Sequence, residues 1–308
     1  MSFDRLLKQI EEKQNPTVVG LDPVLDYIPE HIKTECFSQY GETLEGAAQA
    51  FLQFNKGIID AVADVAPAIK PQIAFYEALG YEGIKTYIKT VEYAKEKGLY
   101  VIIDAKRGDI GSTMEAYAAA HLGKTEVGSK NYEAFGGDAL TVNALFGIDG
   151  VQPLLERCRE YDKGIFILAK TSNPSSGQLQ DRKIDGETVY RILGDWCEDW
   201  GKELPGAYGY SAVGAVVGAT YPEQLKELRK ALPHTFFLVP GYGAQGGGAK
   251  DVKDAFDEKG LGAVINASRS ILCAWKKDGD GKNYGQAART EALRMKADLL
   301  SVIGKITL

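Results

Sequence analysis

Eight short apolar runs, each ending in polar or glycine residues, constrain the fold of this chain more than any other feature of its sequence. Short apolar runs rich in β-branched side chains predict buried strands of a parallel sheet. The predicted strands are residues 17–21, 68–71, 99–103, 139–142, 164–169, 212–217, 235–239 and 262–266.

Helical segments separate these strands throughout the chain. Periodic apolar positions predict helices over residues 44–65, 81–97, 114–122, 150–161, 187–201, 222–232, 250–258 and 284–303, after an amphipathic helix over residues 1–13. The alternation predicts a parallel sheet, and eight repeats favour a closed (β/α)₈ TIM barrel over an open sheet. With 308 residues, 44% of them hydrophobic, we expect residues 1–308 to form one domain.

Composition excludes several classes of function. A net charge of -6 argues against a nucleic-acid partner, and no apolar run approaches the ~20 residues that cross a membrane. The four cysteines are far apart and no signal peptide is recognisable, so we expect reduced thiols in a cytoplasmic protein. The isolated histidines His31, His121 and His234 predict no transition-metal site.

Polar residues follow six of the predicted strands. In a barrel, the carboxyl ends of all strands meet at one mouth, where such folds place their chemistry. We therefore expect one site built from the segments that contain Asp22, Lys70, Asp104 with Lys106, Lys170 to Asn173, Gly241 to Gly248, and Arg269.

The third strand ends in a D-x-K-x-x-D pattern made by Asp104, Lys106 and Asp109. Residues two apart on a strand point to the same face, so Asp104 and Lys106 are expected together. Asp109 follows in the loop, before a capping box that Ser112 and Glu115 are expected to form. About 0.06 chance matches to this pattern are expected in such a chain, so the pattern alone is weak.

Lys70 lies within an apolar strand, where an unpaired ammonium would be costly to bury. Asp104 on the neighbouring strand is its expected partner. Lys70, Asp104, Lys106 and Asp109 then form an alternating series of charges. Such a series is either a structural ion-pair network or, at a barrel mouth beside a phosphate site, catalytic.

Gly241, Gly243 and Gly246 match the G-x-G-x-x-G pattern of dinucleotide-binding turns. The next strand ends in Ser268 and Arg269 rather than in an acid, which argues against a dinucleotide domain. Exposed backbone N–H groups and the Arg269 guanidinium predict a phosphate site, and a merely flexible turn is the alternative. A second capping box is expected from Thr220 and Glu223.

In order along the chain, these motifs resemble the orotidine 5′-phosphate decarboxylase family, specifically the subgroup with a DAKRGDIGST-type motif at residues 104–113. The resemblance covers nearly the whole chain, and the ordered combination of motifs is highly specific. It implies a (β/α)₈ barrel that acts as a homodimer, without metal or organic cofactor. The implied reaction converts orotidine 5′-phosphate to uridine 5′-phosphate and CO₂ in pyrimidine biosynthesis.

The resemblance also implies roles for individual residues. Lys70, Asp104 and Lys106 would serve one subunit's site, while Asp109, with Ile110 and Thr113, would reach into the partner's site. The implied substrate contacts are Asp22 to a ribose hydroxyl, Ser172 to the pyrimidine, and Gln245 with Arg269 to the phosphate. It assigns no role to Lys170, Asn173, residues 25–41 or residues 174–185.

Loss of CO₂ leaves an electron pair at C6 that the pyrimidine ring cannot delocalise. The Lys106 ammonium is expected to stabilise this charge and then to donate the proton. One alternative is a magnesium-dependent sugar-phosphate lyase of the same barrel superfamily, which shares the D-x-K-x-x-D pattern. It would be favoured by an acid at the end of the second strand, where this chain has Lys70. The other alternative is a non-enzymatic sensor of a phosphorylated ligand.

Overall fold

The computed structural model describes residues 1–243, 246–277 and 279–308. Within these ranges, eight parallel strands close into a barrel in the order β1-β12-β11-β10-β7-β6-β3-β2. The prediction of a closed (β/α)₈ barrel is therefore confirmed, and the open sheet is wrong. The barrel strands are β1 (Thr17–Leu21), β2 (Ala68–Pro71), β3 (Tyr100–Arg107), β6 (Ala139–Val142), β7 (Gly164–Lys170), β10 (Val213–Val217), β11 (Phe237–Val239) and β12 (Ala263–Ala267).

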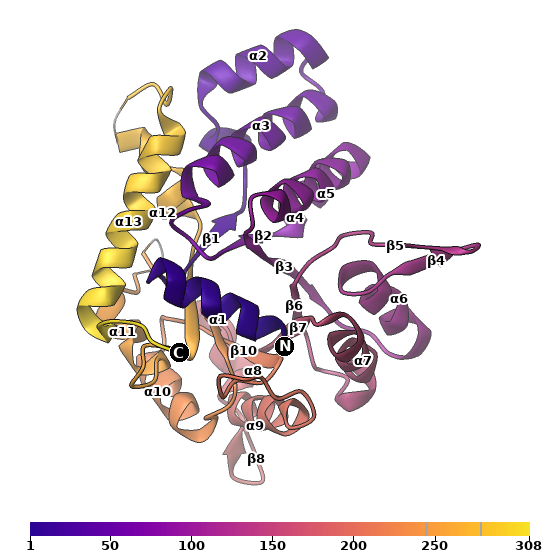
Figure 1. The fold of residues 1–308 in the computed structure, drawn as a ribbon, viewed down its shortest axis with the longest axis vertical. Coiled ribbons are helices and arrows are strands. Elements are labelled where there is room, and N and C mark those ends of the chain that lie inside the picture. Colours follow the sequence, from indigo (N-terminus) through magenta and orange to yellow (C-terminus); the bar gives the residue numbers. More distant parts are fainter. Residues whose placement is uncertain (244–245, 278) are drawn as a thin grey trace.

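Helices surround the barrel, and most of them connect one strand to the next (Figure 1). The longer ones are α1 (Ser2–Lys13), α2 (Glu30–Tyr40), α3 (Leu44–Val62), α5 (Gly80–Glu96), α6 (Gly111–His121), α7 (Gln152–Tyr161), α9 (Val189–Gly201), α10 (Pro222–Ala231) and α13 (Tyr284–Ile303). Short helices, α4 (Ile73–Glu77), α8 (Gly177–Gln180), α11 (Ala249–Val252) and α12 (Arg269–Leu272), lie in the connecting segments. No described helix is long and apolar enough to cross a membrane.

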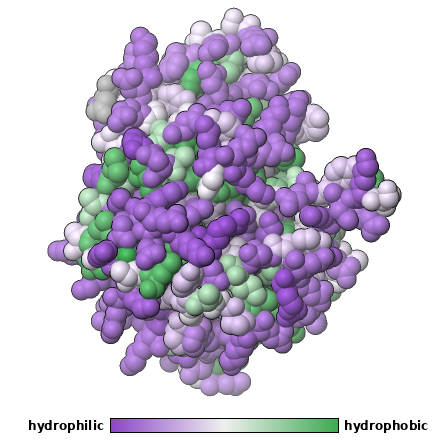
Figure 2. Space-filling model, in the orientation of Figure 1, coloured by the Kyte–Doolittle hydropathy of each residue, from purple (hydrophilic) through white to green (hydrophobic). Residues whose placement is uncertain are grey.

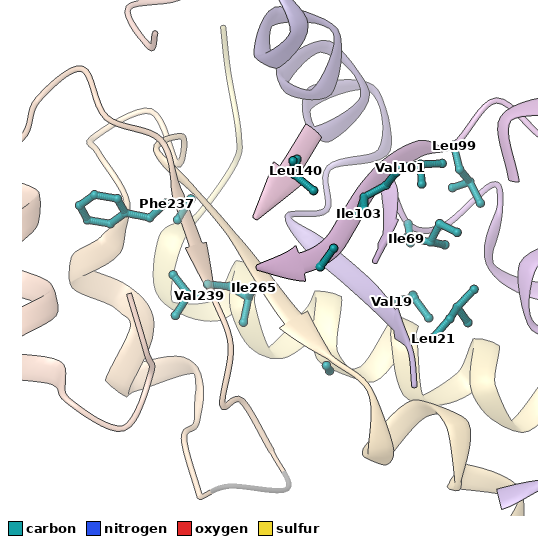
Figure 3. Close-up of a cluster of buried hydrophobic side chains, with 14 of the residues drawn as sticks. Val19, Leu21, Ile69, Leu99, Val101, Ile103, Leu140, Phe237, Val239 and Ile265 are labelled. Carbon is teal, nitrogen blue, oxygen red and sulfur yellow. The ribbon is translucent and has the colours of Figure 1, made fainter. Parts of the chain in front are cut away.

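Strand side chains that point away from the barrel axis form the larger of two hydrophobic cores. Because successive side chains on a strand alternate between its faces, every second residue packs against the helices. Figure 3 shows part of this core, with Val19 and Leu21 of β1 near Ile69 of β2. Its aliphatic side chains fix the helices on the outside of the barrel.

The second core fills the inside of the barrel and is closed at one end by α1. Apolar residues at positions 3, 6, 7 and 10 give this helix one hydrophobic face, and all four are buried. Phe3 stacks on Phe166 of β7 with ring centroids 4.8 Å apart. Ser2 donates to the carbonyl of Asp138, just before β6, at 3.0 Å. The helix therefore covers the amino-terminal ends of the strands.

Both predicted capping boxes are wrong. Helix α6 begins at Gly111, three residues earlier than expected, so Ser112 lies in its first turn and does not cap it. Helix α10 begins at Pro222 after Tyr221, and the Thr220 hydroxyl instead donates to the carbonyl of Ser172 at 3.1 Å. Tertiary contacts outweigh the local capping signal here.

Several elements differ from the sequence prediction. The expected helix over residues 250–258 is only the short α11 followed by a 3₁₀ turn, and the expected strand over residues 235–239 begins at Phe237. Helix α2 and two hairpins, β4 (Thr125–Val127) with β5 (Lys130–Tyr132) and β8 (Lys183–Ile184) with β9 (Glu187–Thr188), were not predicted. The β4–β5 hairpin extends away from the barrel (Figure 1).

The surface in the orientation of Figure 2 is mostly hydrophilic, and hydrophobic residues gather chiefly on the side of α13. Cys36, Cys158 and Cys197 are buried and Cys273 is half-buried, each as a free thiol.

Candidate active site

A cavity of about 640 Å³ lies at the carboxyl ends of the barrel strands. Each of the eight strands contributes a lining residue from its own length or from the position directly after it. This convergence follows from closure, because the carboxyl ends of all parallel strands meet at one mouth. The residues on or directly after the strands are Asp22, Lys70, Asp104, Lys106, Thr141, Leu168, Thr171, Val216, Leu238, Pro240, Asn266 and Ser268.

The strand residues that line the cavity divide into a polar half and an apolar half. Neighbouring strands β2, β3 and β6 supply Lys70, Asp104 and Thr141, whereas β7, β10 and β11 supply aliphatic side chains. An aliphatic wall excludes water and strengthens electrostatic interactions beside it. The aliphatic residues are Leu168, Val216 and Leu238.

Three charged residues form a chain in the polar half. Lys70 Nζ lies 2.5 Å from one oxygen of Asp104, and Lys106 Nζ lies 2.6 Å from the other. Lys70 and Asp104 are almost fully buried, whereas the Lys106 side chain is 46% exposed toward the cavity mouth. The predicted pairing of Lys70 with Asp104 is confirmed.

Burial favours the neutral form of each buried partner, but attraction between opposite charges outweighs it. Asp104 raises the pKa of the Lys70 ammonium above its ordinary value, and Asp22 adds to the effect. Lys70 and Lys106 together hold the pKa of the Asp104 carboxyl well below its usual range. The pair is therefore ionised at neutral pH, and Asp104 presents a fixed negative charge to Lys106.

Thr141 holds the turn on which Lys106 stands. The register between β3 and β6 shifts between Ile103 and Arg107, and Lys106 has a positive φ of 48°. The Thr141 hydroxyl accepts from the backbone N–H groups of Ala105 and Lys106 at 3.1 and 3.0 Å, and it donates to Asp104 at 3.0 Å. One hydroxyl thus satisfies the backbone groups of an irregular strand and orients the carboxylate.

Two buried acceptors in the cavity lack a hydrogen-bond donor among the described residues. They are Oδ1 of Asp22, directly after β1, and Oδ1 of Asn266 on the adjacent strand β12. Buried polar atoms are normally satisfied, so a pair without donors in one cavity indicates a place for a ligand with donor groups. Asn266 was not singled out from the sequence.

The glycine-rich segment after β11 turns back on itself beside the cavity. Gly241, Gly243 and Gly246 all have positive φ, between 76° and 102°, which side chains would disfavour. Gly241 lines the cavity together with Arg269, the first residue of α12. Arg269 forms no ion pair with any described residue, so its guanidinium is available to an anion. Gln245 lies outside the described residues.

Ser172 and its neighbours form another part of the cavity wall, after β7. Thr171, Ser172 and Asn173 all line the cavity. The Ser172 hydroxyl has no hydrogen-bond partner within the described ranges, so it is free for a ligand.

Asp109, Ile110 and Thr113 do not line the cavity of their own chain. Ile110 is 52% exposed, and Thr113 is also exposed. Asp109 bonds to the N–H of Ile110 at 2.8 Å. The structure therefore brings Asp22, Lys70, Asp104, Lys106, Ser172, Gly241 and Arg269 into one cavity, and this loop is not part of the cavity lining.

Sequence reasoning missed Thr141, Asn266 and the aliphatic wall. The sequence contained a signal for the two polar residues, because Thr141 and Asn266 stand at or near the ends of predicted strands. Counting by two along each strand places them on the same inner face as Lys70 and Asp104. Within the part of the chain that the structure describes, no three His, Cys, Asp or Glu side chains are grouped to hold a metal ion.

Known proteins match this chain along nearly its whole length. The model of the orotidine 5′-phosphate decarboxylase / HUMPS family matches residues 49–284. Orotidine 5′-phosphate decarboxylase of Rhodopirellula baltica is 45% identical over 288 residues, 92% of this chain and 93% of that protein. The same enzyme of Clostridium tetani is 41% identical over 304 residues, 98% of this chain and 99% of that protein.

Solved structures agree with the sequence relatives. Leishmania donovani OMP decarboxylase superposes with a TM-score of 0.70 and 29% identity, over 96% of this chain and 98% of that chain. Leishmania donovani UMP synthase superposes with a TM-score of 0.74 and 31% identity, over 96% of this chain and 56% of that longer chain. The chain therefore belongs to the orotidine 5′-phosphate decarboxylase family.

Proposed function

We propose that this protein is an enzyme that converts orotidine 5′-phosphate to uridine 5′-phosphate and CO₂ in pyrimidine biosynthesis. The observation that carries the proposal is the Lys70–Asp104–Lys106 chain beside an aliphatic wall, in a cavity that also contains an arginine with no ion-pair partner among the described residues. Relatives 41% and 45% identical over nearly the whole chain bear the name of this activity. The enzyme works in the cytoplasm, as a single domain over residues 1–308, and belongs to the subgroup with the DAKRGDIGST-type motif.

We assign each part of the substrate to a group of cavity residues. The phosphate binds Arg269 and the glycine segment, where positive charge and backbone N–H groups meet, and Gln245 completes this contact. Oδ1 of Asp22, which has no donor among the described residues, accepts from a ribose hydroxyl. The Ser172 hydroxyl contacts the pyrimidine, which places C6 toward Lys106.

Lys106 performs the chemical step. The bond from C6 to the carboxylate breaks, CO₂ leaves, and the electron pair stays at C6 in the plane of the ring. The Lys106 ammonium stabilises this charge and then transfers one proton to C6, and the neutral amine regains a proton from solvent. Asp104 holds Lys106 in place through their hydrogen bond, while Lys70 offsets the charge of Asp104.

The reaction proposed here needs neither a metal nor an organic cofactor. A magnesium-dependent sugar-phosphate lyase would need an acid at the end of β2, and Lys70 stands there, bonded to Asp104. The test follows the ultraviolet absorbance of orotidine 5′-phosphate with purified protein in excess chelator. We expect full turnover to uridine 5′-phosphate. Turnover that stops in chelator and returns with magnesium would contradict the metal-free mechanism.

We further propose a homodimer in which Asp109 enters the partner's cavity together with Ile110 and Thr113. Apolar side chains are exposed in this loop and in a nearby segment: Ile110 is 52% exposed, and Leu145 and Phe146 are 71% and 48% exposed. Gly150 packs closely against both segments, the Asp109 loop and the Leu145–Phe146 segment. A Cβ at this position would lie 2.9 Å from both the Asp109 carbonyl oxygen and Phe146 Cβ. Adjacent exposed apolar side chains of this kind mark an interface.

Mixing two inactive variants tests the shared site. Lys106→Ala and Asp109→Ala homodimers should each be inactive, whereas a mixed dimer contains one site with neither lesion. Random exchange should therefore restore about a quarter of wild-type activity, because half of the dimers are mixed and each has one intact site. Without recovery after verified subunit exchange, Asp109 would have to act within its own chain.

A further inference from the structure

A fully buried lysine holds the segment that follows β7 against the barrel. Lys170 is the last residue of β7 and is 0% exposed. Its Nζ donates to Oδ1 of Asp181 at 2.7 Å, and it lies 4.3 Å from the ring centre of Tyr221. Among the described residues, Asp181 is the only carboxylate paired with this ammonium. Because an unpaired buried ammonium is costly, this contact ties residues 174–185 to the strand.

Gln180, the residue before Asp181, links the Lys170–Asp181 pair to the cavity wall. Gln180 accepts from the backbone N–H of Thr171 at 2.9 Å and donates to the Thr171 hydroxyl at 2.8 Å. Both bonds of Gln180 therefore end on the first residue of the wall segment, residues 171–173. The position of that segment depends on Gln180, and the position of Gln180 depends on the Lys170–Asp181 pair.

The segment after β10 holds the same wall from the other side. Thr220 donates to the carbonyl of Ser172, and Tyr221 donates to the carbonyl of Asn173, both at 3.1 Å. A Cβ on Gly218 would lie 2.8 Å from Ser172 Cα, so only glycine permits this approach. Tyr221 also contacts the Lys170 ammonium. The cluster of Lys170, Gln180, Asp181 and Tyr221 therefore links the segment after β7 to the segment after β10.

The cluster acts at a distance from the ligand. Residues 171–173 line the cavity, but Lys170, Gln180, Asp181 and Tyr221 do not. In the barrel order, β10 and β11 separate β7 from β12, which is followed by Arg269. The wall segment and Arg269 therefore lie apart around the mouth, so we expect a shift of the wall to change the contact with the base more than the contact of Arg269 with the phosphate.

We propose that the Lys170–Asp181 tether is a positioning device that holds residues 171–173 where they read the pyrimidine base. It sets the affinity for nucleotides with a base and takes no part in breaking the bond to CO₂. The inference rests on the proposed function, since it takes the base to contact Ser172. Preorganising a binding segment increases affinity by reducing what must be ordered on binding.

The test compares a ligand with a base, uridine 5′-phosphate, and a ligand with a hydroxyl in its place, ribose 5-phosphate. Binding of each is measured by calorimetry with wild type, Asp181→Asn, Tyr221→Phe and Lys170→Met. Asp185→Asn is the matched control, because Asp185 is exposed in the same segment, residues 174–185, and forms no ion pair with described residues. Asp181→Glu, which keeps the carboxylate, tests for rescue.

Asp181→Asn should lower the affinity for uridine 5′-phosphate about tenfold and leave the affinity for ribose 5-phosphate unchanged. Asp181→Glu should restore part of the lost affinity. KM for orotidine 5′-phosphate should rise more than kcat falls, and the control should match wild type. Equal weakening of both ligands, or no weakening of uridine 5′-phosphate, would overturn the inference. If Lys170→Met fails to fold, Asp181→Asn still decides, since its side chain is 44% exposed.

The binding measurements also separate this inference from the proposed function, because they require no turnover. Selective loss of uridine 5′-phosphate binding in a protein that does not decarboxylate would leave the tether standing and refute the reaction. Normal decarboxylation by wild type, with equal losses of affinity for both ligands in Asp181→Asn, would support the reaction and refute the role of the tether.

Discussion

The two ends of the barrel are built from the same strands but have opposite character. Near the amino-terminal ends, the inward side chains are apolar and α1 covers them. Two residues further along most of the strands, on the same face, the side chains line a cavity, and on four strands they are charged or polar. The pairs are Ala68 and Lys70, Ile102 and Asp104, Ala139 and Thr141, and Val264 and Asn266.

The difference shows how one sheet separates stability from chemistry. The covered end gains free energy from buried apolar surface. The open end carries a buried ion pair and acceptors without donors among the described residues, which contribute little to stability or reduce it. The predictions below test this division, starting with the largest expected effect.

Replacing Lys106 at the open end should remove activity and leave stability intact. Lys106→Met should lower kcat about 10⁴-fold or more, because it removes both the charge at C6 and the proton donor. The melting temperature should stay near wild type, since this side chain is 46% exposed. Lys183→Met, in an exposed hairpin, is the control. A kcat within tenfold of wild type would remove Lys106 from the reaction.

Replacing Phe166 at the covered end should have the opposite result. This ring is fully buried and stacks on Phe3, so Phe166→Ala should cost about 3–5 kcal/mol in the free energy of unfolding. Urea unfolding measures the loss, and kcat per folded molecule should be retained. Tyr81→Ala is the matched aromatic control, because Tyr81 is 76% exposed. A comparable loss of kcat per folded molecule would show that the ends are not independent.

Thr141 tests how sharply the open end depends on geometry. Thr141→Val keeps the shape but removes the hydroxyl that bonds Asp104 and the turn of Lys106. We expect kcat to fall about 10- to 100-fold, with rescue by Thr141→Ser. Steady-state kinetics of the two variants give the answer. A kcat of Thr141→Val equal to that of wild type would mean that the ion pairs alone position Lys106.

The smallest effect concerns pH and a histidine outside the cavity. Burial, with Arg107 nearby, lowers the pKa of His121 to about 3. The unfolded chain binds this proton near pH 6.5, so stability falls as pH drops from about 6.5 toward 3, by at most ~1.4 kcal/mol per pH unit. His121→Gln should flatten this slope in urea unfolding at pH 6 and pH 5. An unchanged slope would show that His121 is not buried as a neutral ring.

Much of the fold could be predicted because the barrel strands are short and apolar. β1, β2, β6 and α13 have the predicted bounds. β3 continues to Arg107, four residues further than predicted, because its backbone still pairs with β6 after the apolar run has ended. Helix α2 was missed because it buries only Ile32 and Cys36 and so has almost no apolar period.

The site could be predicted in part for a related reason. Lys70 and Asp104 were paired correctly because a buried charge needs a partner, a rule that needs no coordinates. The Lys170–Asp181 pair did not follow from that rule, since Asp181 follows the short helix α8 in a segment whose path the sequence does not specify. The place of Asp109 in a partner's cavity stays a prediction.

The most direct test of the central claim is decarboxylation of orotidine 5′-phosphate in heavy water. If CO₂ leaves at the open end and Lys106 supplies the proton, wild-type protein should release uridine 5′-phosphate with one deuterium at C6. Lys106→Met should release almost none in the same time, although it remains folded. Absence of this product with wild-type protein, or its formation at the wild-type rate by Lys106→Met, would contradict the account.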